Sequence, residues 1–576
     1  MKNKTNLNLL CSKLKTEGVD FYFISTSDEF LNEYVPNYNM RLKWVTNFSG
    51  SNGYALISPK KKFFFTDGRY LLQAKKEIHS SFEILDLKEN SIVNFLTQKL
   101  KNKKILIDTK CFSKNFILDI INNLKSSKNT IIHDEKNLVD SIWFDRPKEK
   151  IKKFFTLKKE YSGRSFEDKL KEIRPSDERV LLITSPESIC WLMNIRGYDL
   201  DHTPLVFCRL IVTKKSIEFF VNTEKLPSKF NITFKNLKVF DIKKFELRLK
   251  KFNKNKIQTD NYISYFFYKI LTKNKFYFKT DPCKILKSKK NKKEIKYSRL
   301  AHLNDSVALI KFFRWLEEER INSNITEFEA AEKLEGFRKE CNEYFSPSFP
   351  TISATGSNGS IIHYKPEKKS SILKDKQLYL CDSGGQYLGG TTDITRTIYL
   401  GKEKPNDQIK KIYTNVLIGH INISSLKFPL GTKGYQIDSL ARFNLWNIGL
   451  DYNHGTGHGV GSFLGVHEGP QSISKNLNSV KLEPGMIISN EPGFYRNGKF
   501  GIRIENLVLV KESQLKNFLE FETLSLFPYE KRLIEFNLLN ESQKKWIRRY
   551  HKEIFSKVST YLDMRHKIWL KKKLKF

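Results

Sequence analysis

The sequence predicts two α/β domains followed by a larger α+β domain, and three observations support this fold class. Short apolar runs alternate with helical patterns in the first part of the chain. The same alternation begins again after a segment at 143–153 that combines a proline with a charge run. From about residue 297 the pattern changes to long amphipathic helices, followed by strands that glycine turns separate. At 576 residues the chain is also too long for a single core.

The first domain is expected to span residues 1–145. Its predicted strands are FYFIS (21–25), YALIS (54–58), KFFFTD (62–67) and KILID (104–108). The second domain, expected over 146–296, repeats the alternation with VLLITS (180–185), LIVTK (210–214) and IEFFVN (217–222). No residue-level repeat connects the two domains, so the similarity of pattern does not by itself prove duplication.

The third domain is expected over 297–576 and holds every candidate metal ligand. Its last part, from about residue 530, is helical in pattern and very basic. A packed or solvated terminal helix is favoured there over amphipathic contact with a membrane. The lysine-rich segments 243–256 and 287–296 are interpreted as solvated charge beside a domain boundary.

The chain carries a formal net charge of +38, which ordinarily suggests nucleic acid or an anionic membrane as a partner. The lysines are spread along the chain, and neither an RNA-recognition nor a helix-turn-helix signature accompanies them. Lysine, asparagine, isoleucine and phenylalanine are all abundant, as a biased base composition would make them. We therefore expect most of this charge to be solvated surface, with no specific nucleic-acid partner.

The seven cysteines are scattered and never form a C-x-x-C pair, so neither a disulfide framework nor a zinc-thiolate site is indicated. The N-terminal segment lacks an apolar region of signal-peptide length, and no run approaches the ~20 apolar residues of a membrane span. These features predict a cytoplasmic protein without a membrane partner.

Two aspartates form the first half of a candidate metal site. Asp382 and Asp393, in DSGGQYLGGTTDITRT, flank the turn signal Gly389-Gly390, so a hairpin would place them nearly opposite each other. Adjacent carboxylates repel unless a cation lies between them. The alternative, if the pair stood alone, is two aspartates that merely flank a turn.

Two glutamates repeat this arrangement. Glu491 in SNEPGFY and Glu505 in GIRIENLVLV lie on either side of Asn497-Gly498, and Asn-Gly is a strong hairpin signal. Arg503 shares a strand face with Glu505 and could neutralise or orient the acidic site. An ordinary surface ion pair is the alternative for Arg503.

The segment between the hairpins, HGTGHGVG, has glycine at every second position, which indicates an extended and closely approached backbone. Both of its imidazoles would then face one way. A lone histidine is usually structural, but a chain with only eleven histidines places three at 454, 458 and 467. His454, His467 and the further His363 in SIIHYKP supply donors in addition to the candidate ligand His458.

Four carboxylates and one imidazole are too many acids for a single zinc ion. They suit two hard or borderline divalent ions about 3.5–4 Å apart, bridged by shared carboxylates, which generate a bridging hydroxide at neutral pH. The order Asp, Asp, His, Glu, Glu, with a hairpin at each end, makes the combined signal strong.

With these motifs, the chain resembles the pita-bread metallopeptidases, and most closely the three-domain, cytosolic-type Xaa-Pro aminopeptidase (aminopeptidase P) family. The resemblance covers nearly the whole chain. It includes RLKWVTNFSGSNGYALIS, FTDGRY, WFDRPKEK, SICWLMNIRGYDLDHTP, SFPTISATGSNGSIIHYKP and HGTGHGVGSFLGVHEGP. It implies two creatinase-like α/β domains before a catalytic pita-bread domain. It also implies two divalent ions, with manganese expected and cobalt or zinc as alternatives, and a homodimer.

The resemblance further implies a role for each matching residue. Asp382 would bind one ion, His458 and Glu491 the other, and Asp393 and Glu505 would bridge them. Glu491 would carry the proton between the nucleophile and the leaving nitrogen. Histidines 454 and 467 would hydrogen-bond the carbonyl oxygen and oxyanion, His363 would line the proline pocket, and Arg503 would support the acidic site.

The implied activity is release of the N-terminal residue from peptides with proline in second position, by attack of the hydroxide that bridges the two ions. Two alternatives remain. A prolidase shares the ligands but takes dipeptides, and the full-length first two domains argue against it. A non-catalytic relative that binds RNA or protein would have lost ligands, whereas all five are present.

Overall fold

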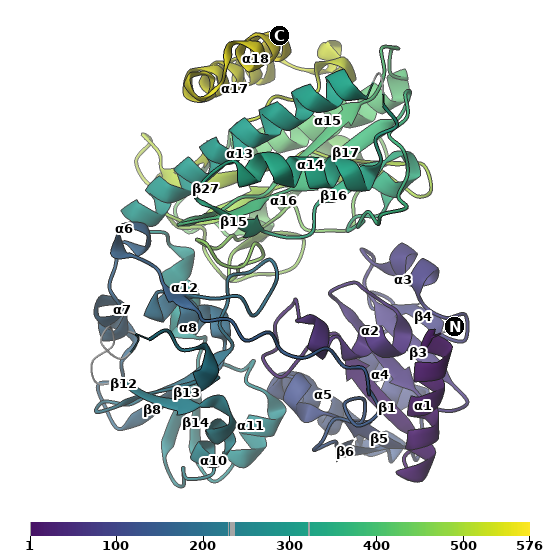
Figure 1. Ribbon diagram of the computed structural model, residues 1–576, viewed down its shortest axis with the longest axis vertical. Coiled ribbons are helices and arrows are strands. Elements are labelled where there is room, and N and C mark those ends of the chain that lie inside the picture. The colour runs from purple at the N-terminus through teal and green to yellow at the C-terminus, as the bar shows by residue number, and fades with distance from the viewer. Residues whose placement is uncertain (1, 229, 231–236, 321–322, 576) are drawn as a thin grey trace. The chain divides into compact units, whose positions relative to one another are not determined.

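The computed structural model describes residues 2–228, 230, 237–320 and 323–575 (Figure 1), and the chain forms two compact units. The first unit comprises Met1–Leu157, Ser165–Asp201 and Leu205–Cys283. The second comprises Lys158–Arg164, His202–Pro204 and Lys284–Phe576, and it contains every predicted site residue.

The first unit contains two six-stranded sheets of the same topology. In the first sheet the order is β4-β3-β2-β1-β5-β6, and only the β3–β2 and β2–β1 pairs are antiparallel. In the second sheet the order is β12-β11-β10-β8-β13-β14, with the same two antiparallel pairs at the same places. The two α/β patterns of the sequence are therefore two copies of one architecture.

The strand bounds agree with the seven predicted apolar runs to within two residues at each end, whereas β4, β6, β12, β13 and β14 had no predicted run. In the first sheet they are β1 Phe21–Ser25, β2 Gly53–Ile57, β3 Lys62–Thr66, β4 Glu83–Asp86, β5 Lys104–Ile107 and β6 Thr130–His133. In the second sheet they are β8 Arg179–Ile183, β10 Cys208–Val212, β11 Ile217–Val221, β12 Leu237–Asp241, β13 Lys256–Thr259 and β14 Lys275–Phe278.

The first sheet is covered on both faces, which explains why its strands read as continuous apolar runs. Leu7, Leu10 and Leu14 of helix α1 (Lys2–Thr16) pack against alternate strand residues such as Tyr22 and Ile24. Helices α4 (Ile92–Gln98) and α5 (Lys114–Asn123) pack on the opposite face, against residues that include Phe21 and Phe23.

The second unit is built around antiparallel sheets that helices cover (Figure 1). One sheet has the order β16-β17-β20 and another the order β21-β28-β27-β24. Their bounds are β16 Ile352–Thr355, β17 Leu378–Ser383, β20 Ile394–Tyr399, β21 Lys427–Pro429, β24 Ile487–Asn490, β27 Asn506–Glu512 and β28 Phe518–Thr523. Helices α13 (Lys292–Glu319), α14 (Glu327–Lys339) and α15 (Asp407–Ser424) share one apolar core with β17 and β20.

The long predicted helix begins earlier than its apolar pattern. Helix α13 starts after Asn291, whose side chain accepts hydrogen bonds from the backbone of Lys293 and Glu294, and Glu294 completes a capping box. The expected domain boundary at 296–297 therefore falls inside this helix. The division into three domains stays a prediction.

Both predicted hairpins are confirmed. Strand β17 pairs antiparallel with β20, so that Asp382 lies opposite Thr395. Strands β25 (Gly493–Arg496) and β26 (Phe500–Arg503) pair around Asn497-Gly498, where Gly498 has φ +67°. These two hairpins bring their carboxylates towards the middle of the second unit.

The basic tail forms helices α17 (Glu541–Val558) and α18 (Met564–Leu574). Trp546, Ile547, Tyr550 and Ile554 of α17 lie in the large core, so the prediction of a packed terminal helix is confirmed. In the described part of the chain, no helix combines the length and the apolar character needed to cross a membrane.

The interpretation of segment 287–296 as solvated charge is wrong for two of its lysines. Lys287 and Lys290 are buried, whereas Lys289 between them is half exposed. The reason is a buried carboxylate partner elsewhere in the second unit, which sequence spacing does not reveal.

The pH dependence of stability tests the packing of the tail. Burial lowers the pKa of His551 to about 4, from an ordinary value near 6.5. Below about pH 6.5 the imidazole of His551 binds a proton in the unfolded chain but not in the folded chain, so the stability of the fold decreases as pH falls. The expected loss is about 1.4 kcal/mol per pH unit. Calorimetric melting temperatures should therefore fall less between pH 7.5 and 5.5 for His551→Gln than for the wild type.

His79→Gln, at an exposed position in the first unit, is the control for this comparison and should follow the wild type. Parallel curves for wild type and His551→Gln would contradict the prediction.

Candidate metal centre

The five predicted ligands lie at or next to the ends of five strands, of which β17 pairs with β20 and β24 pairs with β27. Asp382 is in β17 and Asp393 directly precedes β20. His458 ends β22 (Gly457–His458), Glu491 follows β24, and Glu505 precedes β27. The backbone N–H of Glu505 donates to the carbonyl of Thr395, at 3.1 Å, which fastens this segment to β20. Side chains 123 positions apart in sequence, from Asp382 to Glu505, thus meet because the strands converge.

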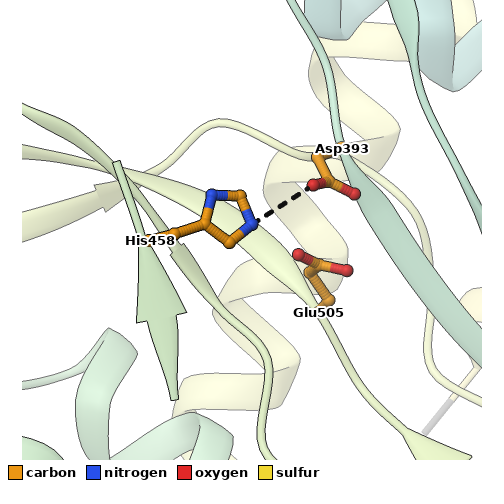
Figure 2. Close-up of side chains that lie close together, drawn as sticks. All are labelled: Asp393, His458 and Glu505. Atoms are coloured by element: carbon orange, nitrogen blue, oxygen red, sulfur yellow. Dashed lines mark ion pairs between the residues drawn. The ribbon is translucent and has the colours of Figure 1, made fainter. Parts of the chain in front are cut away.

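Asp393, His458 and Glu505 offer ligand atoms that all lie within 4.8 Å of one another (Figure 2). The Nε2 atom of His458 is 3.6 Å from Oδ2 of Asp393 and 3.5 Å from Oε1 of Glu491. Asp382 joins this group through Arg503, whose Nη2 donates to Oδ2 of Asp382 at 2.5 Å. The structure therefore gathers the predicted set.

The carboxylates of Asp393, Glu491 and Glu505 are crowded, and their surroundings raise their pKa values. Burial, followed by the charges of neighbouring carboxylates, raises the pKa of Asp393 and of Glu505 well above the ordinary range. Burial raises the pKa of Glu491 to about 7, with Arg503 opposing the shift and Asp382 adding to it. Without further positive charge, these acids would hold protons near neutrality.

The residues fit a divalent metal. Oδ1 of Asp382 and Oδ1 of Asp393 are buried, and no described residue donates a hydrogen bond to either. Buried oxygens of this kind need an explanation, and a cation is one that also relieves the repulsion between the acids. Four carboxylates and one imidazole are the ligand types that hard or borderline divalent ions prefer.

Arg503 organises one side of the site. Its Nε donates to the hydroxyl of Thr395 at 3.1 Å, and that hydroxyl donates to Oε2 of Glu505 at 2.6 Å. The predicted neutralising role of Arg503 is therefore supported, but its direct ion pair is with Asp382 rather than with Glu505. Sequence reasoning missed Thr395, although it stands two residues after Asp393 and so shares its strand face.

Tyr495 is a second residue that sequence reasoning missed. Its hydroxyl accepts from Nη1 of Arg503 at 2.6 Å and lies 2.9 Å from Nε2 of His454. The signal was its position four residues after Glu491 on the strand of the second hairpin.

The histidines gather near Glu491. Nδ1 of His454 lies 3.9 Å from Oε2 of Glu491, and the rings of His458 and His467 are edge to face with centroids 4.4 Å apart. The hydroxyl of Ser489, also missed by sequence reasoning, accepts from the backbone N–H of His458 and donates to Glu491. The structure thus brings three predicted histidines together.

His363 is half-buried in a turn beside Ile362, whose carbonyl accepts from Nη2 of Arg503 at 3.5 Å. This places the segment of His363 on the Arg503 side of the site. Its part in a proline pocket stays a prediction.

Four family descriptions match the chain in succession. The creatinase/prolidase N-terminal domain matches residues 7–142, and a second description of that domain matches 145–294. Metallopeptidase family M24 matches residues 296–512, and the C-terminal region of peptidase M24 matches 517–575. The matched region 296–512 contains all five predicted ligands.

Similar proteins match over almost the full length. A probable Xaa-Pro aminopeptidase P from Laccaria bicolor is 37% identical, over 97% of this chain and 91% of the relative. The solved X-prolyl aminopeptidase from Caenorhabditis elegans, described as a cytosolic enzyme with a di-nuclear active site, has a TM-score of 0.95 and 30% identity over 100% of both chains. The prolidase from Pyrococcus furiosus has a TM-score of 0.50 and 26% identity, over 62% of this chain and 98% of that one.

The fold, the site and these matches identify the chain as a member of metallopeptidase family M24, with creatinase-like domains before the pita-bread domain. Within that family it belongs with the Xaa-Pro aminopeptidase P proteins.

Metal binding should depend on pH because metal and protons compete for the same carboxylates. With the pKa of Glu491 raised to about 7 by burial, the free protein holds a proton there below neutrality and loses it above. Manganese affinity of chelator-treated protein should therefore rise between about pH 6 and pH 8, by up to about tenfold per pH unit for each proton displaced. Titration calorimetry in two buffers of different ionisation enthalpy should detect proton release.

Asp393→Asn, which removes a ligand with little change of shape, should abolish this binding. Equal affinity at both pH values, with no proton release, would contradict the prediction.

Proposed function

We propose that this protein is a metal-dependent aminopeptidase that releases the N-terminal residue from peptides with proline in the second position. The observation that carries the proposal is the gathering of the predicted ligands and three histidines in a chain similar over its full length to Xaa-Pro aminopeptidases. A fold alone would not support a reaction, because fold and activity vary independently.

The metal site is proposed to hold two divalent ions, with manganese first and cobalt or zinc as alternatives. Asp382 is assigned to one ion, His458 and Glu491 to the other, and Asp393 and Glu505 to both. When bound there, the ions would polarise the scissile carbonyl and lower the pKa of water. The di-nuclear site of the nematode relative supports the number of ions.

Glu491 is assigned the proton transfer. A pKa of about 7 in the metal-free protein shows how strongly burial and nearby charge act on this carboxylate. Its Oε1 accepts from the Ser489 hydroxyl at 3.1 Å, so the carboxylate is held in one orientation. A fixed carboxylate at this position can take a proton from the attacking water and deliver it to the leaving nitrogen.

The oxygen of the scissile carbonyl needs a hydrogen-bond donor, and His467 is favoured for that role. Nδ1 of His454 lies 2.8 Å from the Gly455 carbonyl, so in neutral His454 this atom is the donor and Nε2 accepts from Tyr495. His454 in this arrangement has no proton to offer substrate, although it lies beside Glu491. His467, half-buried next to His458, is the more direct donor, and His454 would act after a change of tautomer.

Proline explains why a dedicated site is needed. The X-Pro amide lacks an N–H and its ring fixes φ, so a peptidase that recognises an ordinary extended backbone loses both hydrogen bonding and fit. His363 is proposed to line the proline pocket, while Arg503 holds Asp382 in place. The free amino terminus of the peptide would bind near the metal.

Three further predictions accompany the function. The chain is proposed to form three domains over 1–145, 146–296 and 297–576, which the successive family matches support. A homodimer and a cytoplasmic location are also proposed, the latter supported by the description of the nematode relative as cytosolic.

Hydrolysis of Arg-Pro-Pro and of Ala-Pro by chelator-treated protein, alone and with manganese, cobalt or zinc, tests the activity. We expect free arginine from the tripeptide only when metal is present. Arg-Ala-Ala is the matched control and should stay intact. Cleavage of Ala-Pro alone would identify a prolidase instead, a reading that the match to the archaeal prolidase over only 62% of the chain disfavours. No cleavage with any metal would favour a binding protein.

Glu491→Gln should lower kcat at least about 100-fold, because the amide cannot carry the proton and is a weaker ligand. Melting temperature should change little, since the amide is isosteric. Glu483→Gln, at a half-exposed glutamate of the same region, is the control and should keep wild-type turnover. Near wild-type activity of Glu491→Gln would rule out the assigned proton transfer.

A further inference from the structure

Two lysines of segment 287–296 are buried against one glutamate. The side chains of Lys287 and Lys290 are 3% and 0% exposed, and that of Glu468 is 1% exposed. Lys287 Nζ lies 2.9 Å from Oε2 of Glu468, and Lys290 Nζ lies 3.3 Å from Oε1. Each lysine therefore pairs with a different oxygen of the same carboxylate. We call these three residues the lysine–glutamate cluster.

The cluster is a costly arrangement. Burial lowers the pKa of Lys290, and Glu468 opposes that shift. For Glu468 the effect of burial is outweighed by the two ammonium groups, which bring its pKa below the ordinary value. Because burying charges costs more than packing apolar side chains of the same size, the cluster is not explained as a source of stability alone. What it does provide is a fixed position for the glutamate.

Glu468 is joined through the backbone to two residues of the metal centre. It directly follows His467, the proposed donor to substrate. Its N–H donates at 2.8 Å to the carbonyl of Gly459, which directly follows the ligand His458. The N–H of Gly459 in turn donates at 3.1 Å to the carbonyl of Gln471. A shift of Glu468 would therefore move both rings, whose centroids are 4.4 Å apart.

The glycines of HGTGHGVG make room for this glutamate. A Cβ atom at Gly459 would lie 2.2 Å from the carbonyl oxygen of Glu468, and one at Gly461 would lie 2.7 Å from its Oε2. Both distances are below 3.0 Å, so a side chain at either position would force its neighbours to shift. Part of the alternating glycine pattern that identified the metal centre thus reflects the close approach of Glu468.

The lysines are themselves anchored beside the strand that leads to Glu491. The N–H of Lys290 donates to the carbonyl of Gly485 at 2.9 Å, and Lys289 forms a bridge with Met486 directly before β24. The cluster therefore connects the strand of one ligand, Glu491, with the segment that carries His458 and His467.

We propose that Lys287 and Lys290, acting through Glu468, are positioning residues that set where His467 and His458 stand relative to each other. This inference rests on the proposed function, because the role of His467 comes from it. It extends that function by naming residues with no contact to substrate or metal that nevertheless control turnover.

The test compares Lys287→Met with Lys289→Met. Lys287→Met leaves the ammonium of Lys290 paired with the carboxylate of Glu468, a pair with no net charge, so the fold should survive. Glu468→Ala, in contrast, would leave two buried ammonium groups without their carboxylate. Lys289→Met removes the same charge two positions away, from a half-exposed lysine that pairs with Glu483. We expect Lys287→Met to lower kcat about 10-fold or more with KM nearly unchanged, and Lys289→Met to behave as wild type.

A double-mutant cycle separates positioning from general support. In a His467→Ala background, Lys287→Met should cause little further loss of kcat, because the ring whose position relative to His458 the cluster sets is gone. The inference would be overturned if the losses of kcat in the two single variants multiplied in the double variant. It would also be overturned if Lys287→Met, fully folded and with full metal content, kept the wild-type kcat. Wild-type turnover of His467→Ala would instead refute the proposed role of His467. Melting temperature and bound metal, measured for each variant, show that kcat is compared between equally folded and loaded proteins.

Discussion

The crowding of four carboxylates around one imidazole, three of them buried and that of Glu491 partly buried, is the constraint on which the second unit depends. Like charges at this spacing repel, and burial strengthens the repulsion because little water remains to screen it. The raised pKa values of Asp393, Glu505 and Glu491 are the result of burial and of this repulsion when no metal is bound. A divalent ion relieves it, so metal binding and the geometry of the site are two consequences of one electrostatic requirement.

Two sets of basic residues support this site, and each acts differently. Arg503 contacts the acids directly, through Asp382, and through Thr395 it also orients Glu505. The lysine–glutamate cluster is proposed to work differently, through the backbone of Glu468. Arginine suits the first position because its rigid fork serves several acceptors at once, here Asp382, Tyr495 and Thr395.

The large net charge of the chain does not have a single meaning. Most lysines are exposed, as a solvated surface requires, and some form ordinary surface ion pairs that contribute little stability. Lys287 and Lys290 are different, because each is buried and each has an oxygen of Glu468 to itself. Composition alone does not separate exposed lysines, lysines in surface ion pairs and buried lysines such as these two.

The sequence by itself determined seven of the strands and the two hairpins, and it predicted the five candidate ligands that the fold brings together, because each follows from local periodicity, turn residues or residue type. It did not determine that Arg503 pairs with Asp382, 121 positions away, or that Thr395 supports Glu505, 110 positions away. Nor did it reveal the contact between Lys290 and Glu468, 178 positions apart, and it placed that lysine in solvent. Such contacts depend on how strands and helices pack in three dimensions, and a local pattern of charge carries no information about which distant partner the fold will supply.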